Sequence, residues 1–147
     1  MDVPAELLSK LERYCAFQER CEFDIRKKLT SMPCSVAQRD EIIRRLKEHD
    51  FLNEQRYVET FVRSKLHEQW GKLKIRQALY VKNIAPSLID ENMNSMDEDA
   101  YAQMIAEVVE KWKKLHSADV GNRPKLFRYM LTRGFTIQEV MSVIEDK

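Results

Sequence analysis

The sequence predicts an all-α protein made of three tandem three-helix repeats. Four apolar positions recur along the 147-residue chain with offsets of 50 and then 51 residues. These positions are Ile25, Ile75 and Leu126; Leu29, Leu79 and Met130; Cys34, Ile84 and Phe135; and Ile43, Met93 and Ile144. A fixed period of this size indicates stacked units of supersecondary structure. Only 3 Gly and 4 Pro are present, which favours long helices over many short strands.

The first unit is expected to span residues 1–52. Apolar residues at helical spacing between Leu7 and Cys15 predict its first helix. The second helix is expected over Glu22–Ser31. Ser35-x-x-Gln38 reads as a capping box, so a third helix should begin directly after Ser35.

The second unit is expected over residues 53–96. Asn53 is a good N-cap for its first helix, which Trp70-Gly71 should end. Its middle helix is expected over Lys72–Lys82 and carries Leu73, Ile75 and Leu79, of which Ile75 and Leu79 should turn away from Lys72 and Arg76. Asn83 suits the left-handed residue after this helix. Pro86 fits the first position of the third helix, where a missing N–H costs nothing.

The third unit is expected over residues 97–147. Its longest helix should run from about Asp97 to Leu115, and its middle helix over Arg123–Arg133. Thr136-x-x-Glu139 is a capping box for the last helix. The three units together predict nine helices in three triplets.

Positive charge is concentrated in the middle of a chain whose formal net charge is only +1. The cations between positions 63 and 82 are Arg63, Lys65, Lys72, Lys74, Arg76 and Lys82, against the single acid Glu68. A second group is Arg123, Lys125, Arg128 and Arg133, and a third is Arg26, Lys27 and Lys28. Recurrence on the middle helix of each unit favours a binding face for a polyanion or acidic partner, although a solvated helix face is the alternative. Trp70 either stacks on a nucleic-acid base or fills the core.

The sequence contains no motif typical of catalysis, of a cofactor or of a metal. Its three glycines are far apart, so no phosphate-binding loop is formed, and its three histidines lie one per unit. Cys15, Cys21 and Cys34 have no metal-ligand spacing, which predicts structural, metal-free thiols. No signal peptide and no apolar run of membrane length is seen, and a cytoplasmic, non-enzymatic protein is expected.

Two stretches of the middle unit carry a family resemblance. Phe51–Arg63 and Trp70–Leu79 resemble the RecX family, the bacterial regulators of the RecA recombinase, and Arg128–Phe135 resembles that family's last repeat. The first unit departs from the family pattern at Pro33 and Asp50, where glycine is usual.

The resemblance implies helix-turn-helix-like modules in an elongated, curved molecule. It also implies a protein that binds RecA, typically within its filament on single-stranded DNA, and inhibits recombination as part of the regulation of DNA repair and the SOS response. A monomer without a cofactor is expected. From the resemblance we expect the best-matched surface segment, Arg63 to Arg76, to take part in binding the partner.

Two other functional classes remain open. One is a tandem helix-turn-helix protein that reads DNA directly, and the other is a helical scaffold for protein–protein interaction. The third helices carry several acids and make a poor phosphate surface: Asp40, Glu41, Asp90, Glu91, Glu139 and Glu145. Salt-dependent binding to bare DNA separates the two classes.

Overall fold

A computed structural model of the chain describes residues 2–145. Within that range the protein contains nine α-helices, one short 3-10 turn and no β-strand, which confirms the predicted all-α class. The helices are α1 (Ala5–Phe17), α2 (Glu22–Leu29), α3 (Val36–Glu48), α4 (Glu54–His67), α5 (Lys72–Val81), α6 (Pro86–Asn94), α7 (Glu98–Leu115), α8 (Arg123–Thr132) and α9 (Ile137–Glu145), with the 3-10 turn η1 (Ser117–Asp119) before α8.

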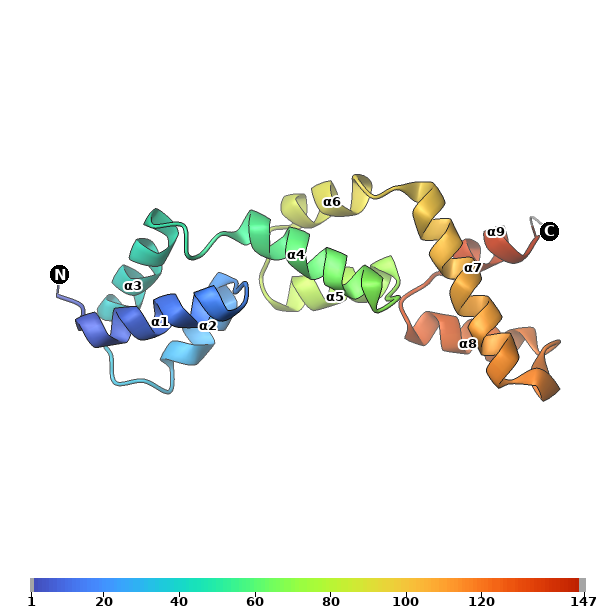
Figure 1. Cartoon of the computed structure of the whole chain (residues 1–147), viewed down its shortest axis with the longest axis horizontal. Coiled ribbons are helices and arrows are strands. Elements are labelled where there is room, and N and C mark those ends of the chain that lie inside the picture. Colours follow the sequence, from blue (N-terminus) through green and yellow to red (C-terminus); the bar gives the residue numbers. More distant parts are fainter. Residues whose placement is uncertain (1, 146–147) are drawn as a thin grey trace.

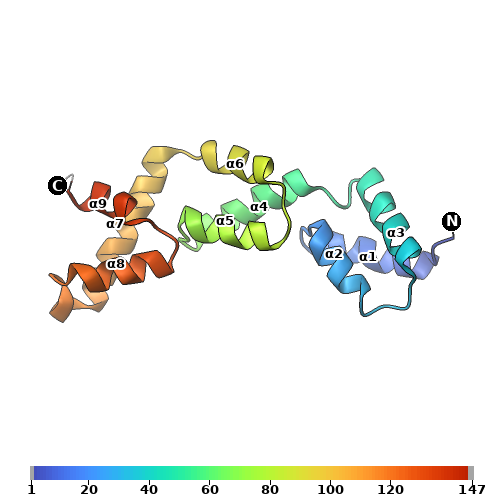
Figure 2. The same cartoon turned by 180° about the vertical axis from the view of Figure 1, so that it is seen from behind.

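The helices form three groups arranged in a row, with the two chain ends at opposite ends of an elongated molecule (Figure 1). The same row is seen from behind in Figure 2. Each group has its own cluster of buried side chains: α1–α3 enclose one, α4–α6 a second and α7–α9 a third. The unit limits after residues 52 and 96 stay a prediction, and both fall in segments that lie between helices.

The recurring apolar positions form the three cores. Ten of the twelve are buried, and Cys34 and Ile144 are half-buried. Each unit therefore uses equivalent positions to pack its middle helix against the other two. Because a unit of about fifty residues buries only a modest core, contacts between neighbouring units should add to its stability.

The predicted caps are present. The Ser35 and Gln38 side chains form their reciprocal capping box, and Thr136 and Glu139 form theirs at 2.8 and 3.0 Å. Asn83 adopts a φ of 59°, the left-handed conformation expected at the end of α5.

Helix α2 is two residues shorter than expected. After Leu29 the backbone bonds shorten to three residues: the N–H of Ser31 donates to the carbonyl of Lys28, and that of Met32 to the carbonyl of Leu29. The hydroxyls of Thr30 and Ser31 also donate to the carbonyls of Lys27 and Lys28, at 2.6 and 2.9 Å, and add to the satisfied carbonyls of this last turn.

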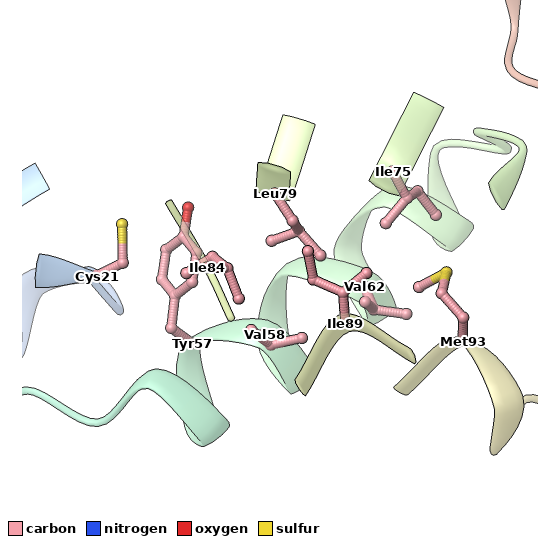
Figure 3. Packing of buried hydrophobic residues seen from close by; sticks show 9 residues of the cluster. All are labelled: Cys21, Tyr57, Val58, Val62, Ile75, Leu79, Ile84, Ile89 and Met93. Carbon is pink, nitrogen blue, oxygen red and sulfur yellow. The ribbon is translucent and has the colours of Figure 1, made fainter. Parts of the chain in front are cut away.

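The first two units share part of a core. Cys21 lies in the turn between α1 and α2, is fully buried, and belongs to the cluster of the second unit. Figure 3 shows its side chain next to Tyr57, at the end of a row that continues through Leu79 to Met93. Burial raises the pKa of the Cys21 thiol to about 12, which suits a packed thiol rather than a reactive one.

Candidate interaction surface

The second and third units are joined through their backbones. The N–H of Gly71 donates to the carbonyl of Arg133 at 2.7 Å, and the N–H of Leu73 donates to the carbonyl of Gly134 at 3.0 Å. Between them, the N–H of Lys72 donates to the Tyr101 hydroxyl at 2.9 Å. The first N–H groups of a helix have no partner within the helix, so the third unit caps α5.

Two glycines permit this close approach. A Cβ added at Gly71 would lie 2.2 Å from the carbonyl carbon and oxygen of Gly134. Gly134 has a φ of 98°, and its own added Cβ would lie 2.4 Å from the Cβ of Lys74. The Arg133 guanidinium also donates to the carbonyls of Glu68 and Gln69, at 2.7 and 3.0 Å. The α5–α8 region is therefore a rigid, preformed part of the surface.

The first and second units are joined by side chains instead. Lys82 of α5 pairs with Asp24 of α2, and Arg56 of α4 pairs with Glu19. The N–H of Glu22 donates to a carboxylate oxygen of Glu54 at 3.2 Å. Cys21 and Asn83 occupy the positions equivalent to Gly71 and Gly134, so this junction carries two side chains where the other has only hydrogen atoms.

The carboxylates of this first junction have opposite pKa shifts. Burial raises the pKa of Glu54, and the nearby Glu22 and Asp24 carboxylates add to the rise. Burial also acts to raise the pKa of Asp24, but hydrogen bonds from Lys82 and Cys21 outweigh it, so the net pKa of Asp24 is lowered. Within this junction Asp24 is therefore stabilised as the anion, whereas the anion of Glu54 is destabilised.

The basic residues of α5 do not form a single patch. The Lys72 ammonium lies 4.6 Å from the centre of the Tyr101 ring, and Arg76 pairs with Asp90 at 2.6 Å, so both are directed to neighbouring helices. Lys74 lies on the other side of α5, because residues two positions apart in an α-helix differ in direction by about 200°. The charges that the sequence grouped together are therefore split between two faces.

Trp70 brings two other cations together. The ammonium groups of Lys65 and Lys74 lie 4.7 and 4.1 Å from the centre of its ring, and Phe61 meets the ring edge-on at 6.4 Å. Lys65 also pairs with Glu68 at 3.0 Å. Trp70 is half-buried against the core of the second unit, as the core interpretation predicts, and it also orders these two lysines.

The remaining predicted cations of the second unit lie elsewhere. Arg63 is exposed on α4 and lines a cavity of about 650 Å³ between α4 and the first half of α7. The floor of that cavity is apolar, with Leu66 and Met104 among its residues. Lys82 is paired with Asp24 in the junction between the first and second units, so its charge is already balanced within the molecule.

The other two basic groups are also partly used within the molecule. Lys125 pairs with Asp119 at 2.8 Å, and the Arg133 guanidinium donates to the carbonyl of Glu68 in the turn between α4 and α5. Arg123 and Arg128 are exposed. In the first unit Arg26 pairs with a carboxylate of its own helix and with one of α3, both at 3.1 Å. All of the predicted contacts between these residues and a partner stay predictions.

An apolar groove lies beside Trp70 between α5 and α8. We call it the α5–α8 groove; it has a volume of about 600 Å³ and is lined by Trp70, Leu73, Lys74, Gln77, Ala78, Val81, Leu131, Thr132 and Gly134. Ile75 and Leu79 of the same helix are fully buried, as the sequence predicted, whereas Leu73 is 48% exposed in this groove. The available signal was the position of Val81 and Leu131, which are apolar but lie off the buried stripe of their helices.

The part of the chain that the structure describes contains neither a cluster of metal ligands nor a helix that could span a membrane. Among residues 2–145, no three His, Cys, Asp or Glu side chains gather as metal ligands would. No helix in the same range is both long and apolar enough to cross a membrane. Burial raises the pKa of Cys15 to about 11, which keeps that thiol protonated at neutral pH.

The fold and its surfaces define a helical-repeat protein whose candidate sites are faces and junctions rather than a catalytic pocket. Residues 53–93 match the family model described as RecX, second three-helix domain. Regulatory protein RecX of Clostridium acetobutylicum is 28% identical over 133 residues, which cover 86% of this chain and 62% of that protein. Regulatory protein RecX of Escherichia coli strain SE11 is 24% identical and is covered over 90% of its length. The chain thus spans less than two thirds of the Clostridium relative but most of the E. coli one.

Two solved structures have the same fold. A crystal structure of regulatory protein RecX superposes with a TM-score of 0.85 over 97% of this chain and 73% of that one, at 25% identity. RecX from Lactobacillus salivarius superposes with a TM-score of 0.81 over 97% of both chains, at 23% identity. The second unit thus matches the second three-helix domain of the RecX family, and the chain as a whole resembles regulatory proteins of that family in sequence and fold.

Proposed function

We propose that this protein binds the RecA recombinase assembled on single-stranded DNA and inhibits its recombination activity in the bacterial cytoplasm. The observation that carries the proposal is the agreement of the whole elongated array with a RecX structure, over 97% of the chain. Relatives from several bacteria bear the name regulatory protein, which supports a modulator rather than an enzyme.

An elongated array suits a repetitive partner. Successive units stand in a row, so a single molecule can contact several neighbouring protomers of a filament at once (Figure 1). Each contact can then be weak while the sum is strong, because the later contacts form within one complex. The protein is expected to act as a monomer with no cofactor.

The central test is the ATPase activity of RecA on single-stranded DNA, together with strand exchange, while this protein is titrated in. Wild type should inhibit both activities, and raising the salt concentration should weaken the inhibition because exposed charges are screened. The absence of any wild-type effect would count against the proposal. Binding of wild type to bare single-stranded DNA, measured alongside, tests the direct DNA-binding alternative.

Charge reversal tests the transferred segment. The triple change Lys72→Glu, Lys74→Glu and Arg76→Glu should reduce inhibition much more than any single change, because each exposed charge contributes only about 0.5–1 kcal/mol and reversal adds repulsion. The same reversal at Arg26, Lys27 and Lys28 of α2, the third basic group, shows whether the equivalent helix of the first unit contributes to inhibition as well. With folding checked by circular dichroism, equal inhibition by wild type and the α5 triple variant would remove this segment from the interface and move the search to Arg123–Arg133.

A further inference from the structure

We propose that the α5–α8 groove binds a segment of a protein partner that carries a carboxylate next to an apolar side chain. The inference deepens the proposed function and rests on it, because it assigns the chemistry of the contact that a RecA filament would make. Three features of the groove carry it: exposed aliphatic walls, a positive end and a rigid frame.

The walls of the groove are apolar and open to solvent. Leu73 is 48% exposed, Val81 is 59% exposed and Leu131 is 46% exposed, whereas Ile75, Leu79 and Leu126 of the same two helices are buried. Leu73 and Val81 come from α5 and Leu131 from α8, so the exposed surface is shared by two units. A contiguous apolar hollow of this kind is typical of a protein contact site.

One end of the groove is positive. Lys74 is the only charged residue in its lining, and its ammonium group lies 4.1 Å from the centre of the Trp70 ring. The Lys65 ammonium lies 4.7 Å from the same ring, outside the lining. Glu68 pairs with Lys65 but is not part of the groove, so no carboxylate of the lining neutralises Lys74. A carboxylate from a partner would therefore be stabilised beside Trp70, while its apolar neighbour packs against Val81 and Leu131.

The frame of the groove is preformed. The backbone bonds from Gly71 to Arg133 and from Leu73 to Gly134 fix the start of α5 against the end of α8. A rigid groove loses little conformational entropy when it is filled, which favours binding. Nucleic acid is a poorer match, because its phosphates require a series of cations along the track and this lining offers only one.

The test compares variants in direct binding to a defined probe, RecA assembled on oligo(dT) with a non-hydrolysable ATP analogue. Fluorescence anisotropy of the full chain labelled at its N-terminus gives the Kd. Val81→Glu and Leu131→Glu place a like charge where the carboxylate-bearing segment should lie, and each should weaken binding by about ten-fold or more. The matched control is Val36→Glu on α3, where the side chain is 67% exposed and lies far from the groove; its Kd should stay within about two-fold of wild type.

Lys74 tests the charge requirement separately. Lys74→Glu should weaken binding by about ten-fold, and Lys74→Arg should restore most of the affinity because it returns the positive charge.

Three results would overturn the inference, and they are distinguishable. If wild type binds the filament but Val81→Glu and Leu131→Glu bind equally well, the groove is not the contact although the proposed function stands. If wild type does not bind the filament, the proposed function and this inference fail together. If the groove variants lose affinity for bare oligo(dT) in parallel, the occupant is nucleic acid and not protein.

Discussion

Replacing Gly71 by alanine should weaken the junction between the second and third units. The added methyl would lie 2.2 Å from two backbone atoms of Gly134 and 2.6 Å from the N of Phe135. Backbone atoms cannot move aside as a flexible side chain can, so the two units must separate and lose the bonds that Gly71 and Leu73 donate. Two such bonds contribute about 2 kcal/mol, and the crowding adds about 1 kcal/mol or more. We expect a loss of about 3 kcal/mol and a fall in Tm of roughly 6–12 °C.

Gly121→Ala is the matched control, because a Cβ at Gly121 meets no atom within 4 Å. Thermal and urea denaturation followed by circular dichroism compare the two variants. Amide hydrogen exchange should also show faster exchange at Leu73 in Gly71→Ala only, since its N–H bonds to the third unit. If Gly71→Ala is as stable as Gly121→Ala and exchanges at the wild-type rate, the backbone junction does not hold these units together.

Two further predictions concern the cores and the first junction. Trp112→Ala should cost about 3–5 kcal/mol in urea denaturation, because Trp112 is only 2% exposed. Phe61→Ala should cost about half as much, because Phe61 is only half-buried against its core. A loss under about 1 kcal/mol for Trp112→Ala would contradict its place in the core. Glu54→Gln should raise the Tm at neutral pH, since burial raises the pKa of Glu54 and the folded state therefore disfavours its anion, while the amide oxygen can still accept from Glu22. That gain should shrink as the pH falls through the raised pKa, where wild type becomes protonated; a gain that is constant from about pH 8 to about pH 4 would contradict the assignment.

The fold could be predicted from the sequence because each repeat carries the same local signals, namely capping residues and apolar residues at helical spacing. Capping residues such as Ser35, Asn53 and Asp97 stand where their helices begin, and the side chains of all three accept the expected backbone bonds. The recurring apolar positions then select the face of each helix that is buried. Start signals and periodicity agree, which makes the assignment of helices reliable.

The candidate site was harder to predict because charge does not reveal its partner. Lys72 and Arg76 lie four residues apart on α5. The sequence could not show that Lys72 would lie over the Tyr101 ring or that Arg76 would pair with Asp90. Leu73 lies two residues before Ile75, so it points to the opposite side of α5 from the buried residues, and the sequence did not single it out as part of a surface. The close approach of Gly71 to Gly134 joins residues 63 positions apart, and no local pattern indicates such a contact.

The two junctions differ in a way that the repeat itself determines. Gly71 and Gly134 allow backbone contact, whereas Cys21 and Asn83 at the equivalent positions impose a junction of ion pairs and one shared thiol. The second helix of the third unit cannot repeat the backbone junction, because Pro124 stands in the place of Leu73 and has no N–H to donate. Ion pairs at a surface weaken as salt is raised, but backbone hydrogen bonds between packed glycines depend on it much less. The second and third units are therefore joined by contacts that depend little on salt, and a partner that recognises the α5–α8 groove meets a surface held by them, whereas the junction with the first unit combines ion pairs with a shared buried thiol.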